Sequence, residues 1–507
     1  FFFTHGTAIS WALAGLATLF VGLRLQSRTF LFTAFAVQLL GGALFLLRLQ
    51  GAGDESGAVL SAGWNGLLSA SLIGMALIVG MLWAVRDEGV RSDVRLLRGL
   101  SVVLLAGLML INLAVLFVLP WQTASAVWAA SGLLIIWLSL YLKQRVSFAF
   151  GLVLQVIGGA AFLMAGPELL GPLASEGLRP LAHGGFWTPL VLGLAALVGA
   201  WRLQLGNHDT AFDVLNLQRL SDVLLLWGAG WWALAWISEV LRFAPLNLQA
   251  TLLLAVAALS VALWGWLTLR LKWPSLGLLC TLLIPAAGLV LLGAWHGRYH
   301  PAANVGWLAW VGVFVVHFIA LRRLAPMLPG RALSAAHVLG CWLLIGVLAL
   351  ELRYGLLLLS EQYNAWRWLG WAILPSLYLV LMASPRAWPW PVSAYPREYR
   401  VYAAAPLALL MLGWFWLANI VSDGTAEPLP YVPLINPLEL GLLFALSGVY
   451  AWSRSAVTQR VIGSAYAACA TQLIAGVSLF AFFTALVMRT AHHWGGVAFE
   501  LDALLES

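Results

Sequence analysis

The sequence predicts an all-α protein, a polytopic transmembrane helix bundle with about 16 spans. Hydrophobic residues make up 62% of its 507 residues and charged residues only 9%. In soluble domains about 45–50% of the residues are apolar and about 25% are charged. The apolar residues form continuous runs, and a helix needs about 20 such residues to cross a bilayer. The runs do not alternate with polar residues, which favours helices over a closed barrel.

Polar or proline-rich sequence separates the apolar runs and sets the limits of the expected helices. The longest break lies near 167–186, which leaves no room for a soluble domain, so 1–507 is expected to be one transmembrane region. In order, we expect spans near 5–24, 29–49, 64–85, 97–119, 123–142, 146–166, 186–204, 218–242, 250–270, 275–295, 303–321, 333–355, 365–384, 399–421, 436–453 and 460–489.

The spans are expected to form pairs. Several first helices run from an aromatic start to a basic end, as in Trp11 to Arg24 and Trp187 to Arg202, and a short basic loop then leads into a second span. Two spans per unit place every unit in the same orientation, so the chain is expected to hold about eight parallel two-helix hairpin repeats rather than inverted repeats. The repeat units lie near 5–50, 64–119, 123–166, 186–242, 250–296, 303–355, 365–421 and 436–490.

Charge sets the expected orientation. The loops within pairs hold 20 of the 27 Lys and Arg residues, whereas 13 of the 20 acidic residues lie on the opposite side. Cytoplasmic loops carry an excess of Lys and Arg, so the within-pair loops are expected to be cytoplasmic and the between-pair loops and both chain ends to lie outside. The net charge of +7 therefore reflects topology and anionic lipid rather than a nucleic-acid partner.

Charged residues at the outer ends of second helices are the first candidates for a site. Glu239 and Arg242 are three residues apart, close enough to pair on one helical face. Glu351 and Arg353 are two apart and diverge, so each needs a partner on another helix. Charges near a membrane are costly unless they snorkel or pair, so these residues are either structural ion pairs or the lining of a polar outer cavity.

The last outer segments supply the remaining candidates. The proline-rich segment 427–437 cannot be helical throughout, and Asn436 is a natural N-cap for a helix that begins at Pro437. Arg489 ends the last span, and His492 and His493 follow it. Adjacent histidines cannot easily bind one ion with both rings, and no carboxylate stands at a diagnostic spacing, so no metal site is expected.

Sequence motifs for catalysis are absent. The chain has no P-loop, no Gly-x-Gly-x-x-Gly after a strand and no Gly-x-Ser-x-Gly, so neither catalytic residues nor a cofactor is expected. The three cysteines lie far apart in apolar runs and are expected to be buried. The chain opens without Met, which indicates the C-terminal part of a longer protein.

Three segments carry a resemblance to a known family. These are Trp11-Ala-Leu-Ala-Gly15 with Gly22-Leu-Arg24, the segment from Leu429-Pro-Tyr to Asn436-Pro-Leu-Glu-Leu440, and Arg489-Thr-Ala-His-His-Trp-Gly-Gly-Val497. They resemble motifs of the predicted bacterial multi-pass inner-membrane proteins grouped as domain of unknown function 2339. The resemblance implies a bacterial inner-membrane location and further spans upstream, but it implies no activity. Ala14 stands where that family usually has Glu.

Three functions fit these features. The first is transport or flipping of an envelope lipid or glycan intermediate, through a polar groove lined by Glu239, Arg242, Glu351, Arg353 and the Asn436 segment. The second is a non-catalytic scaffold that binds membrane lipids or a protein partner, with satisfied ion pairs and no cavity. The third is an enzyme acting on a lipid-linked substrate, which needs converging acids or histidines.

Overall fold

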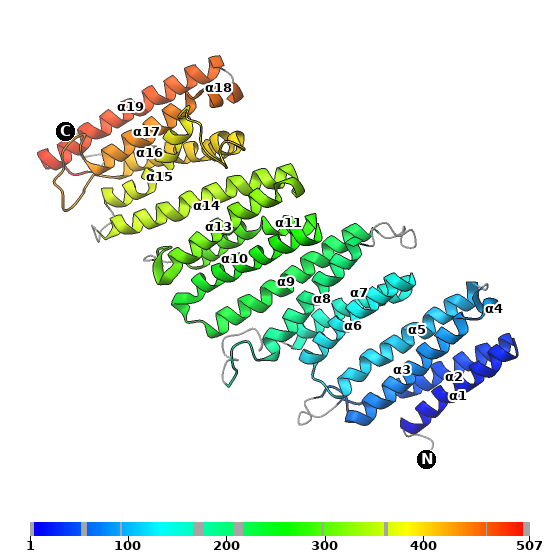
Figure 1. Cartoon of the computed structure of the whole chain (residues 1–507). Coiled ribbons are helices and arrows are strands. Elements are labelled where there is room, and N and C mark those ends of the chain that lie inside the picture. The colour runs from blue at the N-terminus through cyan, green and yellow to red at the C-terminus, as the bar shows by residue number, and fades with distance from the viewer. Residues whose placement is uncertain are drawn as a thin grey trace. The chain divides into compact units, whose positions relative to one another are not determined.

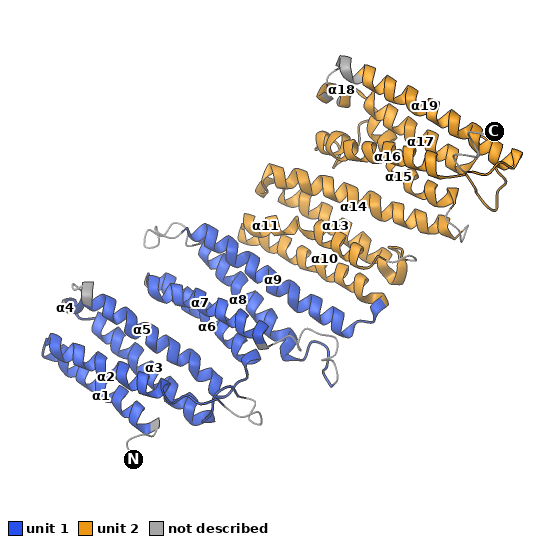
Figure 2. Ribbon diagram, turned by 180° about the vertical axis from the view of Figure 1, so that it is seen from behind, with its two compact units in different colours: residues 1–246 blue, residues 247–507 orange. Residues whose placement is uncertain are grey.

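The structure is a computed structural model, and it describes residues 5–51, 58–91, 94–165, 177–205, 216–295, 299–358, 364–462 and 464–499. These residues are mostly helical and include no β-strand, only two isolated bridges, which confirms the all-α prediction. The chain divides into two compact units, residues 1–246 and 247–507, coloured separately in Figure 2. Each unit is described by itself.

Unit 1 consists of helices that pack with their neighbours along the chain (Figure 1). The closest neighbours are α1 with α2, α3 with α5, α6 with α7, and α8 with α9. The helices are α1 (His5–Arg24), α2 (Arg28–Leu46), α3 (Gly63–Val85), α4 (Glu88–Arg91), α5 (Val94–Ala114), η2 (Val115–Phe117), α6 (Trp121–Leu142), α7 (Arg145–Ala165), α8 (Gly184–Leu205) and α9 (Leu217–Phe243).

Unit 2 is also helical but less regular, with several short segments between the long helices. Its elements are α10 (Leu246–Leu271), α11 (Pro274–Cys280), α12 (Leu283–Gly293), η5 (Ala303–Val305), α13 (Gly306–Leu324), η6 (Ala325–Met327), α14 (Gly330–Leu357), α15 (Ala365–Ala383), the π-helical η7 (Glu398–Ala403), α16 (Ala404–Val421), α17 (Pro437–Ser453), α18 (Ala456–Ile462) and α19 (Ser464–Gly495).

The described residues include 15 helices that are long and apolar enough to cross a membrane, close to the 16 expected. The difference is α17, which has 17 residues and matches the expected span 436–453. The expected span 275–295 is divided into α11 and α12, because Pro285 has no N–H to bond the carbonyl of Thr281 and so interrupts the helical hydrogen bonds. Whether the helices form eight parallel repeats stays a prediction.

Pairs of glycines set the spacing inside three hairpins of unit 1. They are Gly74 with Gly107, Gly132 with Gly151 and Gly193 with Gly228, and a Cβ on either member would lie 2.8–3.0 Å from the carbonyl oxygen of the other. Membrane helices approach closely where side chains are small, because lipid offers no hydrophobic drive for their association. The Gly193–Gly228 contact lets the backbones of α8 and α9 approach closely at this point of the hairpin.

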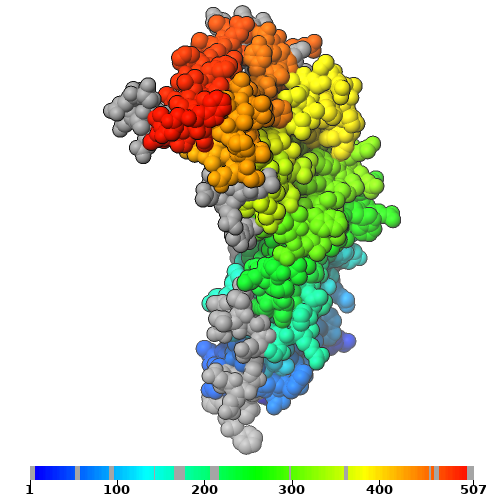
Figure 3. Space-filling view, turned by 90° about the vertical axis from the view of Figure 1, so that its left-hand side faces the viewer, coloured from blue at the N-terminus to red at the C-terminus, as the bar shows by residue number. Residues whose placement is uncertain are grey.

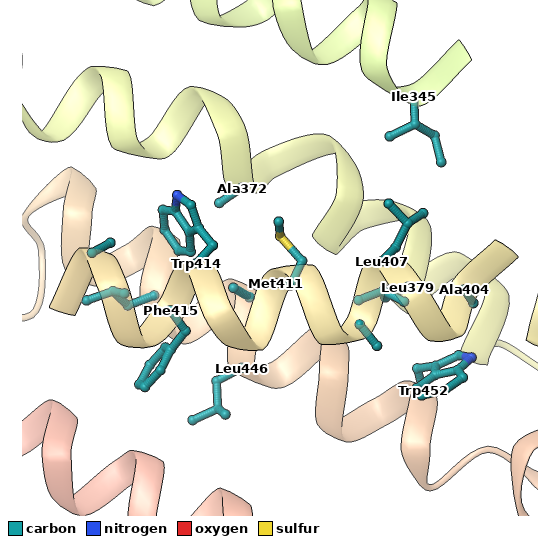
Figure 4. Packing of buried hydrophobic residues seen from close by; sticks show 14 of the residues in the cluster. Ile345, Ala372, Leu379, Ala404, Leu407, Met411, Trp414, Phe415, Leu446 and Trp452 are labelled. Carbon is teal, nitrogen blue, oxygen red and sulfur yellow. The ribbon is translucent and has the colours of Figure 1, made fainter. Parts of the chain in front are cut away.

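The main apolar core of unit 2 surrounds α16. Figure 4 shows Leu407, Met411 and Phe415 on this helix, packed near Leu379 of α15 and Leu446 of α17. Small residues such as Ala372 and Ala404 have no exposed surface and let the backbones approach. This packing holds α15, α16 and α17 together and so positions the polar segments at their ends.

Candidate functional site

In unit 1, the end of α9 binds the segment that precedes α8. The Glu239 carboxylate accepts a hydrogen bond from the backbone N–H of Leu181 at 2.6 Å and another from His183 Nε2 at 2.9 Å. The side chains of Glu239 and His183 are only 7% and 5% exposed. The carboxylate therefore fastens the segment before the first helix of a hairpin to the end of its second helix.

His183 also bridges Glu239 to Arg242. Arg242 Nη1 lies 3.3 Å from His183 Nδ1. An arginine can only donate and a carboxylate can only accept, so this pattern requires a neutral imidazole that carries its proton on Nε2. The Nε and Nη2 atoms of Arg242 are buried without a hydrogen-bond partner among the described residues. The two residues expected to pair are thus linked through a histidine of another segment.

In unit 2, the end of α14 repeats this arrangement. The Glu351 carboxylate lies 3.1 Å from His300 Nδ1 and accepts from the backbone N–H of Ala302 at 3.0 Å. The His300 ring stacks on Tyr354 at a centroid distance of 3.8 Å. Glu351 and His300 are more exposed than their counterparts, at 37% and 23% of their side chains. We call each of these arrangements a carboxylate clamp: the Glu239 clamp (Glu239, Leu181, His183) and the Glu351 clamp (Glu351, His300, Ala302).

Arg353 points to a different partner from Glu351. Its guanidinium carbon lies 5.2 Å from the centroid of the Trp371 ring on α15, within the range of a cation–π contact. The two residues therefore diverge, as their spacing of two predicts. The partner of Glu351 lies in a preceding segment rather than on another helix, and Arg353 Nε has no hydrogen-bond partner among the described residues.

A third carboxylate lies at the start of α17, and it is the most buried of the three. Glu439 and Arg489 of α19 have fully buried side chains and form an ion pair with an Nε–Oε1 distance of 3.4 Å. Arg489 also donates to the backbone oxygen and to Oδ1 of Asn419 on α16, both at 3.1 Å. The charge is thus paired and hydrogen-bonded, as a buried charge must be to remain ionised.

Glu439 also binds the proline-rich segment before α17. It accepts hydrogen bonds from the hydroxyl of Tyr431 at 2.6 Å and from the backbone N–H of Leu434. We call this arrangement the Glu439 clamp (Glu439, Arg489, Tyr431, Leu434). Burial, and to a smaller extent the hydrogen bond to Glu439, raises the pKa of Tyr431 to about 12. The phenol therefore stays protonated and donates its hydrogen bond.

Asn436 caps α17 as expected. Its Oδ1 accepts from the backbone N–H of Leu438 at 2.8 Å, and Pro437 occupies the first helical turn. Its Nδ2 donates to the carbonyl of Gly424 at 2.7 Å, and Gly424 packs against Arg489. The proline-rich segment is therefore packed by protein at this position.

The two adjacent histidines complete this cluster. His493 Nε2 lies 2.9 Å from the carbonyl oxygen of Asp423, and its ring stacks on Tyr431 with centroids 4.3 Å apart. His492 Nδ1 lies 2.6 Å from the carbonyl oxygen of Val497. The structure thus brings four of the eight expected site residues to one end of unit 2, namely Asn436, Arg489, His492 and His493.

Sequence reasoning did not select the residues that complete the clamps. His183 and His300 are the histidine partners, and Glu439, Tyr431 and Asn419 are central to the third cluster. A signal for Glu439 was present, because an acid three residues after an N-cap Asn is a capping-box position. The histidines carried no local signal, since each meets its carboxylate more than 50 residues further along the chain.

Whether the eight expected site residues line one cavity stays a prediction. A hollow of about 160 Å³ in unit 1 is lined by residues of the α1–α2 turn with Asp87 and Leu96, and one of about 520 Å³ in unit 2 is lined by the last turns of α19. Neither includes Glu239, Arg242, Glu351, Arg353 or Asn436 in its lining. Glu239 and Arg242 belong to unit 1, and the other six residues belong to unit 2.

Comparison with known proteins identifies the family of the chain. A family model described as "Predicted membrane protein (DUF2339)" matches residues 36–507. No curated protein and no solved structure matches the chain. The chain belongs to this family of predicted membrane proteins, a description that states no activity.

Proposed function

We propose that this member of the DUF2339 family is a non-catalytic membrane scaffold, whose hairpins are fastened at their ends by carboxylate clamps. One observation carries this proposal: the carboxylates of Glu239, Glu351 and Glu439 all bind donors from their own chain. Each binds a backbone N–H of a segment before a long helix. Carboxylates bound to their own chain in this way hold the segments before the helices in place, which is what a scaffold requires.

The exposed apolar faces of the helices are the surfaces that such a scaffold offers to membrane lipids. Large hydrophobic side chains are exposed along α10 and α19, among them Leu259, Leu473, Phe480 and Val487. In the 18-residue apolar stretch of each of these two helices, less than a quarter of the residues are buried. Apolar surface of this extent is unfavourable in water and is covered by acyl chains in a bilayer. Membrane lipids are therefore the partners that this proposal includes.

The location that fits this proposal is the bacterial inner membrane, with the arginine-rich within-pair loops in the cytoplasm. The distribution of Lys and Arg supports this orientation, because positive loops are retained on the cytoplasmic side. The clamps then lie on the periplasmic side. Labelling of single cysteines introduced at exposed Arg179 and Arg454 tests it: a membrane-impermeant reagent reacts with the first in intact spheroplasts and with the second only after lysis.

A second candidate function is binding and transfer of an anionic envelope lipid or lipid-linked glycan. The observation that favours it is the Arg242 guanidinium, which keeps two nitrogen atoms without partners among the described residues. Such a cation could bind a phosphate through charge-assisted hydrogen bonds. Vesicles that hold the purified protein and fluorescent phosphatidylglycerol test this candidate. If the protein transfers lipid, the wild type should speed the movement of the fluorescent lipid between the two leaflets. Arg242→Gln should abolish this acceleration, and Arg179→Gln, at an exposed residue, should retain it.

Complementation at matched protein abundance tests the scaffold proposal. A strain that lacks the protein is supplied with the wild type, with the double variant Glu239→Gln/Glu351→Gln, or with Glu427→Gln, whose side chain is exposed. If the protein is a scaffold, all three proteins should restore envelope integrity equally when they are equally abundant in folded form. Loss of envelope integrity in the double variant at wild-type abundance would contradict the proposal and favour a site that uses these carboxylates.

A further inference from the structure

Asp423, His492 and His493 gather around one point at the end of α19. One carboxylate oxygen and one nitrogen from each imidazole lie within 4.8 Å of one another, and all three residues are half-buried. The end of α19 lies at the surface of unit 2, as the red atoms of Figure 3 show. The cluster is therefore within reach of solvent ions, unlike the fully buried Glu439–Arg489 pair beside it.

The hydrogen bonds of the two histidines leave one nitrogen of each ring available. A carbonyl oxygen can only accept, so His492 donates from Nδ1 to Val497 and His493 donates from Nε2 to Asp423. In the neutral form of each ring the lone pair then lies on His492 Nε2 and on His493 Nδ1. Histidines that bind metals commonly donate their second N–H to a backbone carbonyl or a carboxylate, which fixes the ring and its tautomer.

The surroundings hold these groups in place without using their free lone pairs. The His493 ring stacks on Tyr431, whose hydroxyl is bound by Glu439. The Asp423 carboxylate accepts from the backbone N–H of Thr425 at Oδ1 and from the Thr425 hydroxyl at Oδ2. These bonds orient the carboxylate, and each oxygen keeps a second lone pair that can bind an ion. Arg489, one turn before the histidines, fastens α19 to α16 and α17. A site on such a support needs little rearrangement to bind an ion.

We propose that Asp423, His492 and His493 bind one divalent transition-metal ion. Two imidazole nitrogens and one carboxylate oxygen are ligands typical of Zn²⁺, at about 2.0–2.2 Å from the metal. Ligand atoms on one tetrahedral ion lie about 3.3 Å apart, so atoms that are as much as 4.8 Å apart close by roughly 1.5 Å when the ion binds. Three protein ligands leave one coordination position for water or another ligand.

Only the folded chain brings the three proposed ligands together. Adjacent histidines alone do not converge, and the third ligand, Asp423, lies 70 residues before His493. The helix ends at Gly495, and Gly496 takes a positive φ of 69° that turns the chain back so that Val497 reaches His492. This return and the packing of α16 against α19 create the cluster.

Zinc binding to the tag-free, full-length protein in detergent tests this inference. Zn²⁺ is titrated in competition with a chromogenic chelator, for the wild type and for Asp423→Asn, His492→Gln and His493→Gln. We expect one Zn²⁺ per chain and at least roughly 10-fold weaker binding in each variant. His300→Gln is the matched control, because His300 is a half-buried histidine of the same unit that binds Glu351, and it should keep the wild-type affinity.

Absorption of the Co²⁺-loaded wild type provides a second readout that needs no variant to fold. Tetrahedral nitrogen and oxygen ligation gives strong visible bands, whereas hexa-aqua Co²⁺ gives weak ones. Absence of Zn²⁺ binding by the wild type, a Co²⁺ spectrum of the aqua ion, or equal loss of binding in His300→Gln and the three ligand variants would each overturn the inference.

Discussion

The Glu239 and Glu351 clamps use the same groups but differ in their exposure to water. In each, a carboxylate near the end of a second helix binds a histidine and a backbone N–H of the segment before a first helix. Glu239 is 7% exposed and lies beside a buried arginine, whereas Glu351 is 37% exposed and its neighbouring arginine turns to a tryptophan. The same contacts should therefore stabilise the two regions by different amounts.

Burial explains the direction of this difference. Water replaces a lost partner at an exposed site, so exposed pairs contribute about 0–1 kcal/mol. A donor or charge left unpaired in a buried site has no such replacement and costs several kcal/mol. The Glu439 clamp, with both charged side chains fully buried, is the extreme member of the series.

The largest expected effect is that of Glu439→Gln. The substitution leaves the Arg489 charge buried without its counter-ion, which should lower the free energy of unfolding by about 3–5 kcal/mol. Thermal unfolding followed by tryptophan fluorescence, in one detergent, measures the change. Glu427→Gln, at an exposed side chain, is the control and should stay within about 0.5 kcal/mol of the wild type. A similar small change in Glu439→Gln would break the ordering by burial.

Glu239→Gln should follow, with a loss of about 3 kcal/mol. The amide keeps one acceptor oxygen, so either His183 or the N–H of Leu181 loses its partner, and the nearby Arg242 charge loses its compensation. The same unfolding measurement reports the change. A shift no greater than that of Glu427→Gln would show that the clamp contributes nothing to unit 1.

The glycine contact between α8 and α9 offers an independent test in the same hairpin. The Cβ of Gly193→Ala would lie 2.9 Å from the backbone nitrogen of Trp232, so the helices must move apart, at a cost of about 2 kcal/mol. Gly230→Ala on α9 is the matched control, because no atom lies within 4 Å of its new Cβ, and it should leave stability equal or higher. Equal unfolding temperatures for both variants would rule out a close contact at Gly193.

The smallest expected effect is that of Glu351→Gln, at about 0.5–1 kcal/mol. Its carboxylate is partly solvated, so water can replace the acceptor that His300 loses. Of the three carboxylate variants, this one should show the largest dependence of its effect on salt concentration, because salt screens exposed charges more than buried ones. Unfolding measured at low and high salt checks this. An effect larger than that of Glu239→Gln would reverse the comparison between the two clamps.

The helices and the capped start of α17 could be predicted from the sequence alone. The direct pairing of Glu239 with Arg242 on one helical face could not, because His183 links the two side chains. Long apolar runs define the spans, and Asn436 before Pro437 identifies a capped helix start. Partners such as His183 for Glu239, Glu439 for Arg489 and Asp423 for His493 lie 50 to 70 residues apart. Their proximity depends on how neighbouring helices pack and where the connecting segments return, which local spacing does not encode.

Amide hydrogen exchange at the clamped segments tests the central claim most directly, namely that these carboxylates hold loops in place. Removal of both acceptor oxygens by Glu239→Ala should speed exchange at Leu181 and leave Ala302 unchanged. Glu351→Ala should do the opposite, so each variant is the control for the other. The account predicts this reciprocal pattern; unchanged exchange at Leu181 in Glu239→Ala and at Ala302 in Glu351→Ala would contradict it.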